Sequence, residues 1–182
     1  MLTRVHTSLL AAFVAALCLL PGSALAEEAT GGASYQPPPK KAVVRNGKAV
    51  APADAPPEVK AIIAAGNKIV DKPYKYGGGH AKVNDTGYDC SGTVSFTLIR
   101  AGLLDTPLDS TAFMGWGAPG KGKWVTIYAN GGHAFMVVAG LRLDTGYRDK
   151  SVAKWGGAPG SGPRWGKPRN PSGFTARHPV DL

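Results

Sequence analysis

A single cysteine stands where a helix is expected to begin. Cys90 follows Asp89 and precedes Ser91, and the chain after it is apolar at helical spacing, which predicts a helix that starts at Cys90. The first N–H groups of a helix have no partners within it, and with the positive end of the helix dipole they favour a thiolate. We therefore predict that Cys90 is a nucleophile rather than a small buried residue.

A thiol nucleophile needs a base to take its proton and a third group to orient that base. His80, His133 and His178 are the histidines beyond the N-terminal segment. Only His133 opens a predicted strand directly after a Gly-Gly turn, so it is the predicted base. Asp144 and His178 compete for the third position. Asp144 is favoured because it lies on the next predicted strand of a tight hairpin, where paired strands are neighbours.

Two helices and the loop between them are predicted to position Cys90. Apolar residues recur at helical spacing over 58–72, with Pro57 suited to the first turn and Pro73 ending the helix. The second helix runs from Cys90 to about Gly102. The loop Tyr74–His80 is too rich in glycine for a regular element and is expected to form one wall of a cleft.

The rest of the chain predicts a small antiparallel sheet. Runs of apolar residues predict strands at 123–128, 133–138, 141–144 and 174–179. The first three are joined by short glycine-containing turns, which favours a meander. A loop at 105–123 is expected to contain a short helical turn near 110–114. The predicted fold class is α+β, with N-terminal helices packed on a small antiparallel sheet.

Three motifs resemble those of the NlpC-type cysteine peptidases of bacterial cell walls. Tyr74–Gly78 is similar to the Tyr-x-Trp/Tyr-Gly-Gly loop of that family, and Asp89–Gly92 to its nucleophile motif. Gly132-His133, which runs into an apolar strand, is similar to its Gly-His-strand motif. The resemblance covers roughly 58–145, which is most of one domain.

The resemblance implies a papain-like fold and a specific chemistry. Cys90 would attack an amide bond in peptidoglycan stem peptides, His133 would act as the base, and a polar residue on the next strand would orient it. The family also implies that Tyr76 points its hydroxyl into the site, and that Asp89 and Ser91 line the substrate groove. It implies no cofactor.

The N-terminal region indicates export. Residues 1–26 contain Arg4, an apolar run and an A-x-A site that ends at Ala26, which is typical of a secretory signal peptide. Cys18 leaves with this segment, so the mature chain is expected to hold one cysteine and no internal disulfide. Residues 27–57 are rich in proline and glycine and are predicted to be a linker, followed by the peptidase domain at 58–182.

Charge indicates the kind of partner. The chain carries a net charge of +9, and only Arg4 of its basic residues lies in the signal segment. We therefore expect a secreted, periplasmic or wall-associated protein that is drawn to peptidoglycan and to anionic wall polymers. No nucleic-acid motif is present. No other stretch is apolar enough to predict a membrane anchor.

Three other functions compete with peptide hydrolysis. The same Cys-His pair could serve acyl transfer or ester hydrolysis, since these reactions share the acyl-enzyme. A non-catalytic wall-binding module is the second alternative, favoured by the basic tail with its tryptophans. The third is a metal site built from Cys90, His80, His133 and an aspartate, which is disfavoured because no two of these share short ligand spacing on one element.

Overall fold

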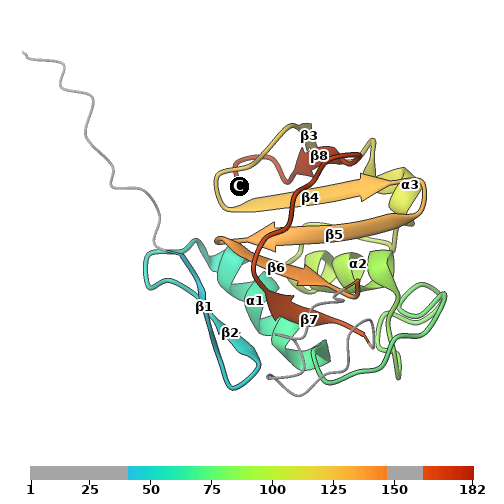
Figure 1. The fold of residues 1–182 in the computed structure, drawn as a ribbon, viewed down its shortest axis with the longest axis horizontal. Coiled ribbons are helices and arrows are strands. Elements are labelled where there is room, and N and C mark those ends of the chain that lie inside the picture. The colour runs from blue at the N-terminus through green and yellow to red at the C-terminus, as the bar shows by residue number, and fades with distance from the viewer. Residues whose placement is uncertain (1–40, 147–161) are drawn as a thin grey trace, which may run out of the picture. The chain divides into compact units, whose positions relative to one another are not determined.

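A six-stranded antiparallel sheet lies at the centre of the described part of the chain, residues 41–146 and 162–182 of this computed structural model (Figure 1). The strand order is β3-β8-β4-β5-β6-β7. The predicted α+β class with an antiparallel sheet is thus confirmed. The elements are β1 (Val43–Arg45), β2 (Lys48–Val50), α1 (Pro57–Ile69), α2 (Cys90–Arg100), α3 (Ser110–Phe113), β3 (Ala118–Pro119), β4 (Val125–Asn130), β5 (His133–Val138), β6 (Leu141–Asp144), β7 (Arg164–Gly166) and β8 (Thr175–His178). The predicted signal peptide and the linker up to residue 40 lie outside the described residues.

The meander predicted for the middle of the chain is present. Strands β5 and β6 begin and end as predicted, whereas β4 begins and ends later than expected. Strand β8 lies within the predicted last strand and pairs with β4, with Tyr128 opposite Ala176. The short helix α3 falls inside the predicted helical turn.

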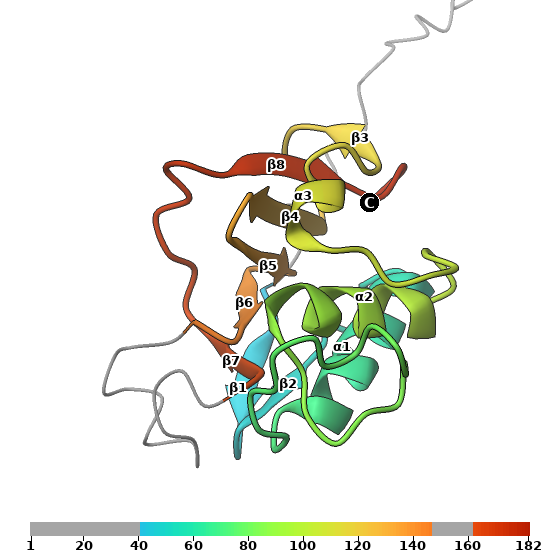
Figure 2. The same ribbon diagram turned by 90° about the vertical axis from the view of Figure 1, so that its right-hand side faces the viewer.

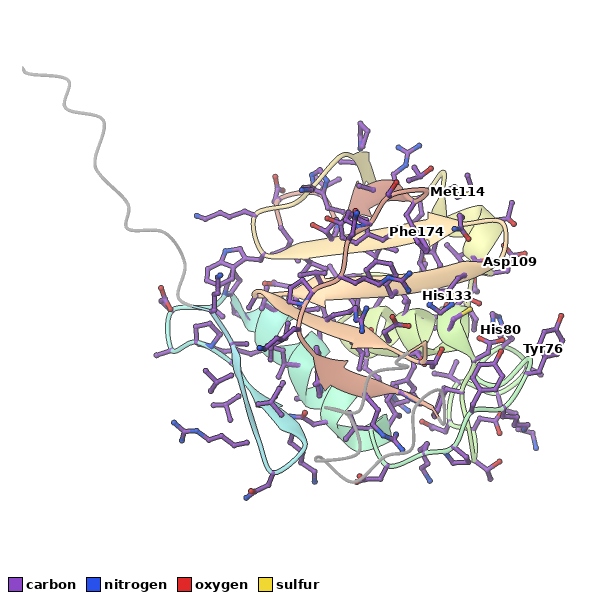
Figure 3. All side chains as sticks on the ribbon, viewed as in Figure 1. Tyr76, His80, Asp109, Met114, His133 and Phe174 are labelled. Carbon is purple, nitrogen blue, oxygen red and sulfur yellow. The ribbon has the colours of Figure 1, made fainter. Side chains whose placement is uncertain are left out.

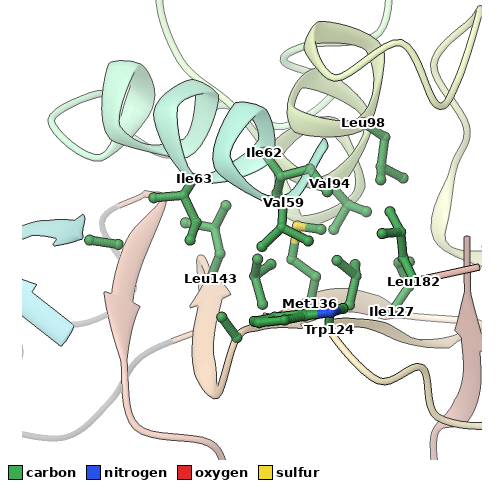
Figure 4. Packing of buried hydrophobic residues seen from close by; sticks show 14 of the residues in the cluster. Val59, Ile62, Ile63, Val94, Leu98, Trp124, Ile127, Met136, Leu143 and Leu182 are labelled. Carbon is green, nitrogen blue, oxygen red and sulfur yellow. The ribbon is translucent and has the colours of Figure 1, made fainter. Parts of the chain in front are cut away.

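Helices α1 and α2 cover one face of the sheet, as Figure 2 shows. Along β5 the alternate residues Ala134, Met136 and Val138 face these helices, because successive side chains of a strand point to opposite faces. Figure 4 shows this core, in which apolar side chains of both helices pack on the strands. Its labelled members are Val59, Ile62, Ile63, Val94, Leu98, Trp124, Ile127, Met136, Leu143 and Leu182. No helix in the described ranges has the length and apolarity needed to cross a bilayer.

A β-hairpin precedes the helices, which corrects two predictions. Strands β1 and β2 pair through an Asn46-Gly47 turn in which both residues have positive φ, as a tight hairpin turn requires. The side chain of Asn67 in α1 donates to the carbonyl of Ala49 and accepts from its N–H, both at 2.8 Å. The prediction of a linker over 27–57 is therefore wrong at 43–50, and the helices are not N-terminal in the fold.

Strand β7 was not predicted from the sequence. It pairs with β6, with Trp165 opposite Leu143, and the indole of Trp165 is 1% exposed. The indole Nε1 donates to Asn67 Oδ1 at 2.9 Å, and the ring lies so close to Gly66 that any side chain there would overlap it. Trp165 therefore joins the edge of the sheet to α1.

Candidate active site

Cys90 is the first residue of α2, as predicted. The preceding residue, Asp89, caps the helix, and its Oδ1 accepts a hydrogen bond from the N–H of Gly92 at 2.7 Å. The thiol is half-buried. Since the first N–H groups of a helix have no acceptors within it, they and the helix dipole lie beside the sulfur.

His133 opens β5 and contacts Asp144 at the end of β6. The distance between His133 Nε2 and Asp144 Oδ1 is 2.8 Å, and the side chain of Asp144 is completely buried. The N–H of Gly146 donates to the same carboxylate oxygen at 2.7 Å, and the Nε of Arg142 lies 3.5 Å from Oδ2. The carboxylate is therefore fixed from several sides, and the imidazole takes its orientation from it.

Cys90 and His133 form a coupled pair. Burial opposes the thiolate, but hydrogen bonds with the side chain of His133 and the backbone of Ala134, and the charge of His133, outweigh it and lower the pKa of Cys90. Burial likewise opposes the imidazolium, yet hydrogen bonds to Asp144 and Cys90 and the charge of Asp144 raise the pKa of His133 to about 9. Both shifts favour the thiolate-imidazolium form of the pair.

The tautomer follows from these contacts. Because Nε2 of His133 is paired with Asp144, Nδ1 is the ring nitrogen left for Cys90. An imidazolium held in this way has one proton on the carboxylate side and one on the sulfur side. The arrangement has the parts of a nucleophile, a base and an orienting acid.

The other candidate for the orienting position lies elsewhere. His178 is in β8, opposite Ala118 of β3, and its Nδ1 lies 3.1 Å from the carbonyl oxygen of Gly120. The structure brings Asp144 to His133 and does not bring His178 there.

Asp89 fastens the glycine-rich loop to the start of α2. Its Oδ2 accepts from the N–H of Gly77 at 3.0 Å, and its own N–H donates to the carbonyl of Gly78 at 3.2 Å. Gly92 lies against that carbonyl, so that a Cβ there would overlap the oxygen. Gly92 of the nucleophile motif is thus required by a close backbone approach, whereas Gly77 of the loop, with open space around it, is favoured by its positive φ of 70°.

His80 joins this network and is a residue that sequence reasoning did not place. Its Nε2 lies 3.1 Å from Asp89 Oδ1 and 3.2 Å from Ser91 Oγ. Ser91 also donates to Asp89 Oδ1, at 3.3 Å. The position of His80 directly after the glycine run was the only available signal.

These residues surround a pocket of about 400 Å³. The loop, the start of α2, the start of α3 and the turn between β4 and β5 all contribute to it. Its lining comprises Tyr74, Tyr76, Gly77, His80, Asp89, Cys90, Ser91, Asp109, Ser110, Gly131 and Gly132. The predicted groove residues Tyr76, Asp89 and Ser91 therefore share one pocket with Cys90.

The two tyrosines of the loop differ in their relation to Cys90. Tyr76 is 91% exposed and lies beyond His80 in Figure 3, and it lines the pocket that contains Cys90. Burial, followed by the negative charges of Cys90 and Asp89, raises the pKa of Tyr74. Tyr74 belongs to the predicted loop but was not predicted as a site residue, and it lines the same pocket as Cys90.

An aromatic cluster supports His133 on the face of the sheet away from α1 and α2. The ring of Phe174 meets that of His133 edge-on at 6.2 Å and that of Phe135 at 5.0 Å between centroids. The guanidinium of Arg169 lies over both phenyl rings, at 5.7 Å from the centroid of Phe135 and 5.6 Å from that of Phe174. The segment that leads into β8 therefore forms a side wall for the histidine.

The described residues include no group of three or more His, Cys, Asp or Glu side chains placed to hold a metal ion. Instead, Cys90 is hydrogen-bonded to His133, and His133 is hydrogen-bonded to Asp144. No protein-family model matches this chain, and no curated protein matches it.

Proposed function

We propose that this protein is a secreted cysteine peptidase that hydrolyses an amide bond in peptidoglycan stem peptides. The observation that carries the proposal is the contact of His133 with a buried Asp144 on one side and with Cys90 on the other, beside a pocket. The resemblance to NlpC-type peptidases supplies the substrate class. A papain-like fold of that type and export after cleavage near Ala26 are parts of the same proposal.

The reaction follows from the charge state of the pair. The Cys90 thiolate attacks the carbonyl carbon, a C–S bond forms, and the electron pair moves to the oxygen, which the start of α2 stabilises. Protonated His133 gives its proton to the leaving nitrogen as the C–N bond breaks. Water then gives a proton to neutral His133 and attacks the thioester, which releases the acid and restores the thiolate-imidazolium pair.

Acyl transfer and ester hydrolysis remain the nearest competing reactions, because they use the same acyl-enzyme and differ in the acceptor or the leaving group. A purely wall-binding role is disfavoured by the geometry. A binding module has no need for a thiol whose pKa is lowered by a histidine that is itself held by a buried carboxylate.

The test uses mature protein and purified peptidoglycan. We expect soluble muropeptides to be released, and expect Cys90→Ala to release none while it still sediments with cell walls through its positive charge. Mass spectrometry of the products would identify the bond that is cut. Unchanged release by Cys90→Ala would contradict the proposal.

A second measurement addresses the thiol alone. Iodoacetamide should modify Cys90 at neutral pH much faster than it modifies glutathione, and His133→Ala should remove that advantage. His178→Ala is the matched control, since it removes a histidine that does not contact the pair. Labelling of wild-type protein no faster than of glutathione would mean that the thiol is not activated.

A further inference from the structure

Among the described residues that line the pocket beside Cys90 there is no lysine or arginine, although the chain carries 21 of these residues. Two carboxylates, Asp89 and Asp109, are among its described lining residues. A net charge of +9 attracts anionic material to the protein as a whole. The pocket itself is therefore suited to a substrate group that is neutral or positively charged.

The two carboxylates are not equally available. Asp89 is 7% exposed, and its Oδ1 already meets Gly92, Ser91 and His80, while its Oδ2 accepts from Gly77. It holds the loop and the helix together. A substrate group would have to compete with these internal contacts.

One carboxylate oxygen of Asp109 is available to a ligand. It caps α3, and its Oδ1 accepts from the N–H of Ala112 at 2.7 Å. Its Oδ2 accepts no hydrogen bond from a residue in the described ranges, and the residue is exposed. The hydrogen bond from Ala112 fixes the side-chain rotamer of Asp109. Its Oδ2 is therefore held in place and can accept a hydrogen bond from a ligand.

The position of Asp109 is fixed by packing as well. Phe113 of the same helix is completely buried, which anchors α3 to the core beside β4. In Figure 3, Asp109 lies at the same end of the sheet as His133 and His80. The carboxylate is thus a rigid part of the pocket wall.

We propose that Asp109 is a specificity-determining residue that binds a primary ammonium group of the peptide substrate. A carboxylate oxygen accepts a charge-assisted hydrogen bond from such a group. Tyr74 and Tyr76 line the same pocket, and the faces of tyrosine rings attract cations. The inference rests on the proposed function for the nature of the substrate. The ammonium can come from the N-terminus of the stem peptide or from the side chain of a diamino acid in it.

The test measures binding rather than turnover. Cys90→Ala protein is titrated with three synthetic stem peptides that contain a diamino acid: one with both amines free, one acetylated at the N-terminus and one acetylated at the side chain. Asp109→Asn, added to Cys90→Ala, should weaken binding of the free peptide about tenfold, the effect of one charge-assisted hydrogen bond at a partly exposed site. Asparagine also caps helices well, so α3 is expected to remain folded.

The acetylated peptides identify which amine binds. One of the two acetylated peptides lacks the amine that binds Asp109, and this peptide should bind about tenfold more weakly to Cys90→Ala than the free peptide does. Adding Asp109→Asn should not weaken the binding of that peptide further. Asp105→Asn is the matched control, since Asp105 is an exposed aspartate of the same loop that does not line the pocket. Equal binding of the free peptide by the Asp109→Asn and Asp105→Asn proteins would overturn the inference.

The two proposals fail in different ways. If wild-type protein releases no muropeptides but ammonium binding depends on Asp109, the peptidase assignment is wrong and the binding site stands. If wild-type protein cleaves peptidoglycan and Asp109→Asn binds all three peptides as the control does, the peptidase assignment stands and Asp109 has no part in specificity.

Discussion

The carboxylate of Asp144 holds the imidazole of His133 at 2.8 Å from a completely buried position, and the two residues are 11 positions apart on neighbouring strands. A charged carboxylate in such a place is stable only when it is paired and hydrogen-bonded. His133, Arg142 and the N–H of Gly146 supply these partners. The contact between Asp144 and His133 therefore has two effects. It stabilises the buried carboxylate in the sheet, and it orients the proposed base.

Asp144→Asn tests the value of that contact. The amide cannot stabilise the imidazolium and does not enforce the tautomer, so we expect kcat to fall by roughly three to four orders of magnitude while the fold is kept. Turnover and circular dichroism of the same sample would check both parts. His178→Ala should retain most activity. The reverse result, in which only the His178 variant is inactive, would contradict the assignment of Asp144.

The pKa shifts predict a pH profile with two limbs. The thiolate-imidazolium pair exists above the lowered pKa of Cys90 and below the pKa of His133, which is about 9. We expect kcat/KM to rise on the acid side with Cys90 and to fall near pH 9 as His133 loses its proton. In Asp144→Asn the alkaline limb should move to lower pH. A limb that stays near pH 9 in this variant would mean that another group sets it.

The same shift makes stability depend on pH. His133 has a pKa of about 9 in the folded protein, above its ordinary value of 6.5, so the folded state binds the proton more tightly than the unfolded chain does. Its contribution to stability is complete below about pH 6.5 and is lost as the pH rises through about 9. Denaturant unfolding of wild-type protein should therefore show a larger loss of stability over this range than unfolding of His133→Ala.

Local patterns in the sequence predicted much of the fold and the centre of the site. Strand β5 starts at His133 and β6 ends at Asp144, and both follow from apolar runs and tight turns. The helix that starts at Cys90 follows from apolar residues at helical spacing, and in the structure the side chain of Asp89 caps it. These elements are set by neighbours in the chain, which is why their residues could be paired before the structure was known.

What the sequence could not predict depends on distant contacts. The hairpin at 43–50 and strand β7 are both held by Asn67, through Ala49 and through Trp165. Neither segment has a hydrophobic pattern long enough to predict a strand alone. The positions of the loop residues in the site could not be predicted from the sequence either. Tyr74 is 44% exposed and Tyr76 91% exposed, and this difference depends on the path of the backbone, in which Gly77 has a φ of 70°, and not on any periodicity.

Gly92→Ala tests the close approach of the loop to α2. A methyl group at this position would overlap the carbonyl oxygen of Gly78, and neither backbone can move without breaking the contacts of Asp89. We expect a loss of stability of about 1–3 kcal/mol or more and a lower Tm. Gly115→Ala is the control, since the nearest atom to its Cβ, an oxygen of Ala112, lies at 3.8 Å. Equal Tm values for the two variants would show that the loop is free to shift.

The ring of Phe174 contacts the imidazole of His133, with 6.2 Å between the ring centroids. The phenyl ring packs edge-on against the imidazole and is held by Phe135, by Arg169 and by the bond from Asn130 Nδ2 to the carbonyl of Gly173 at 3.1 Å. Phe174 is absent from the lining of the pocket. It is therefore expected to act through the position of His133 and not through the substrate.

Phe174→Ala should accordingly lower kcat and leave KM nearly unchanged. Removal of the ring frees the imidazole to leave its position beside Cys90, and a displacement of about 1 Å costs roughly 10- to 100-fold in rate. Phe174→Tyr keeps the ring edge and should restore most of the rate. Val180→Ala, a change at an exposed residue of the same C-terminal segment, should have no effect. A rise in KM at constant kcat would instead place Phe174 in contact with the substrate.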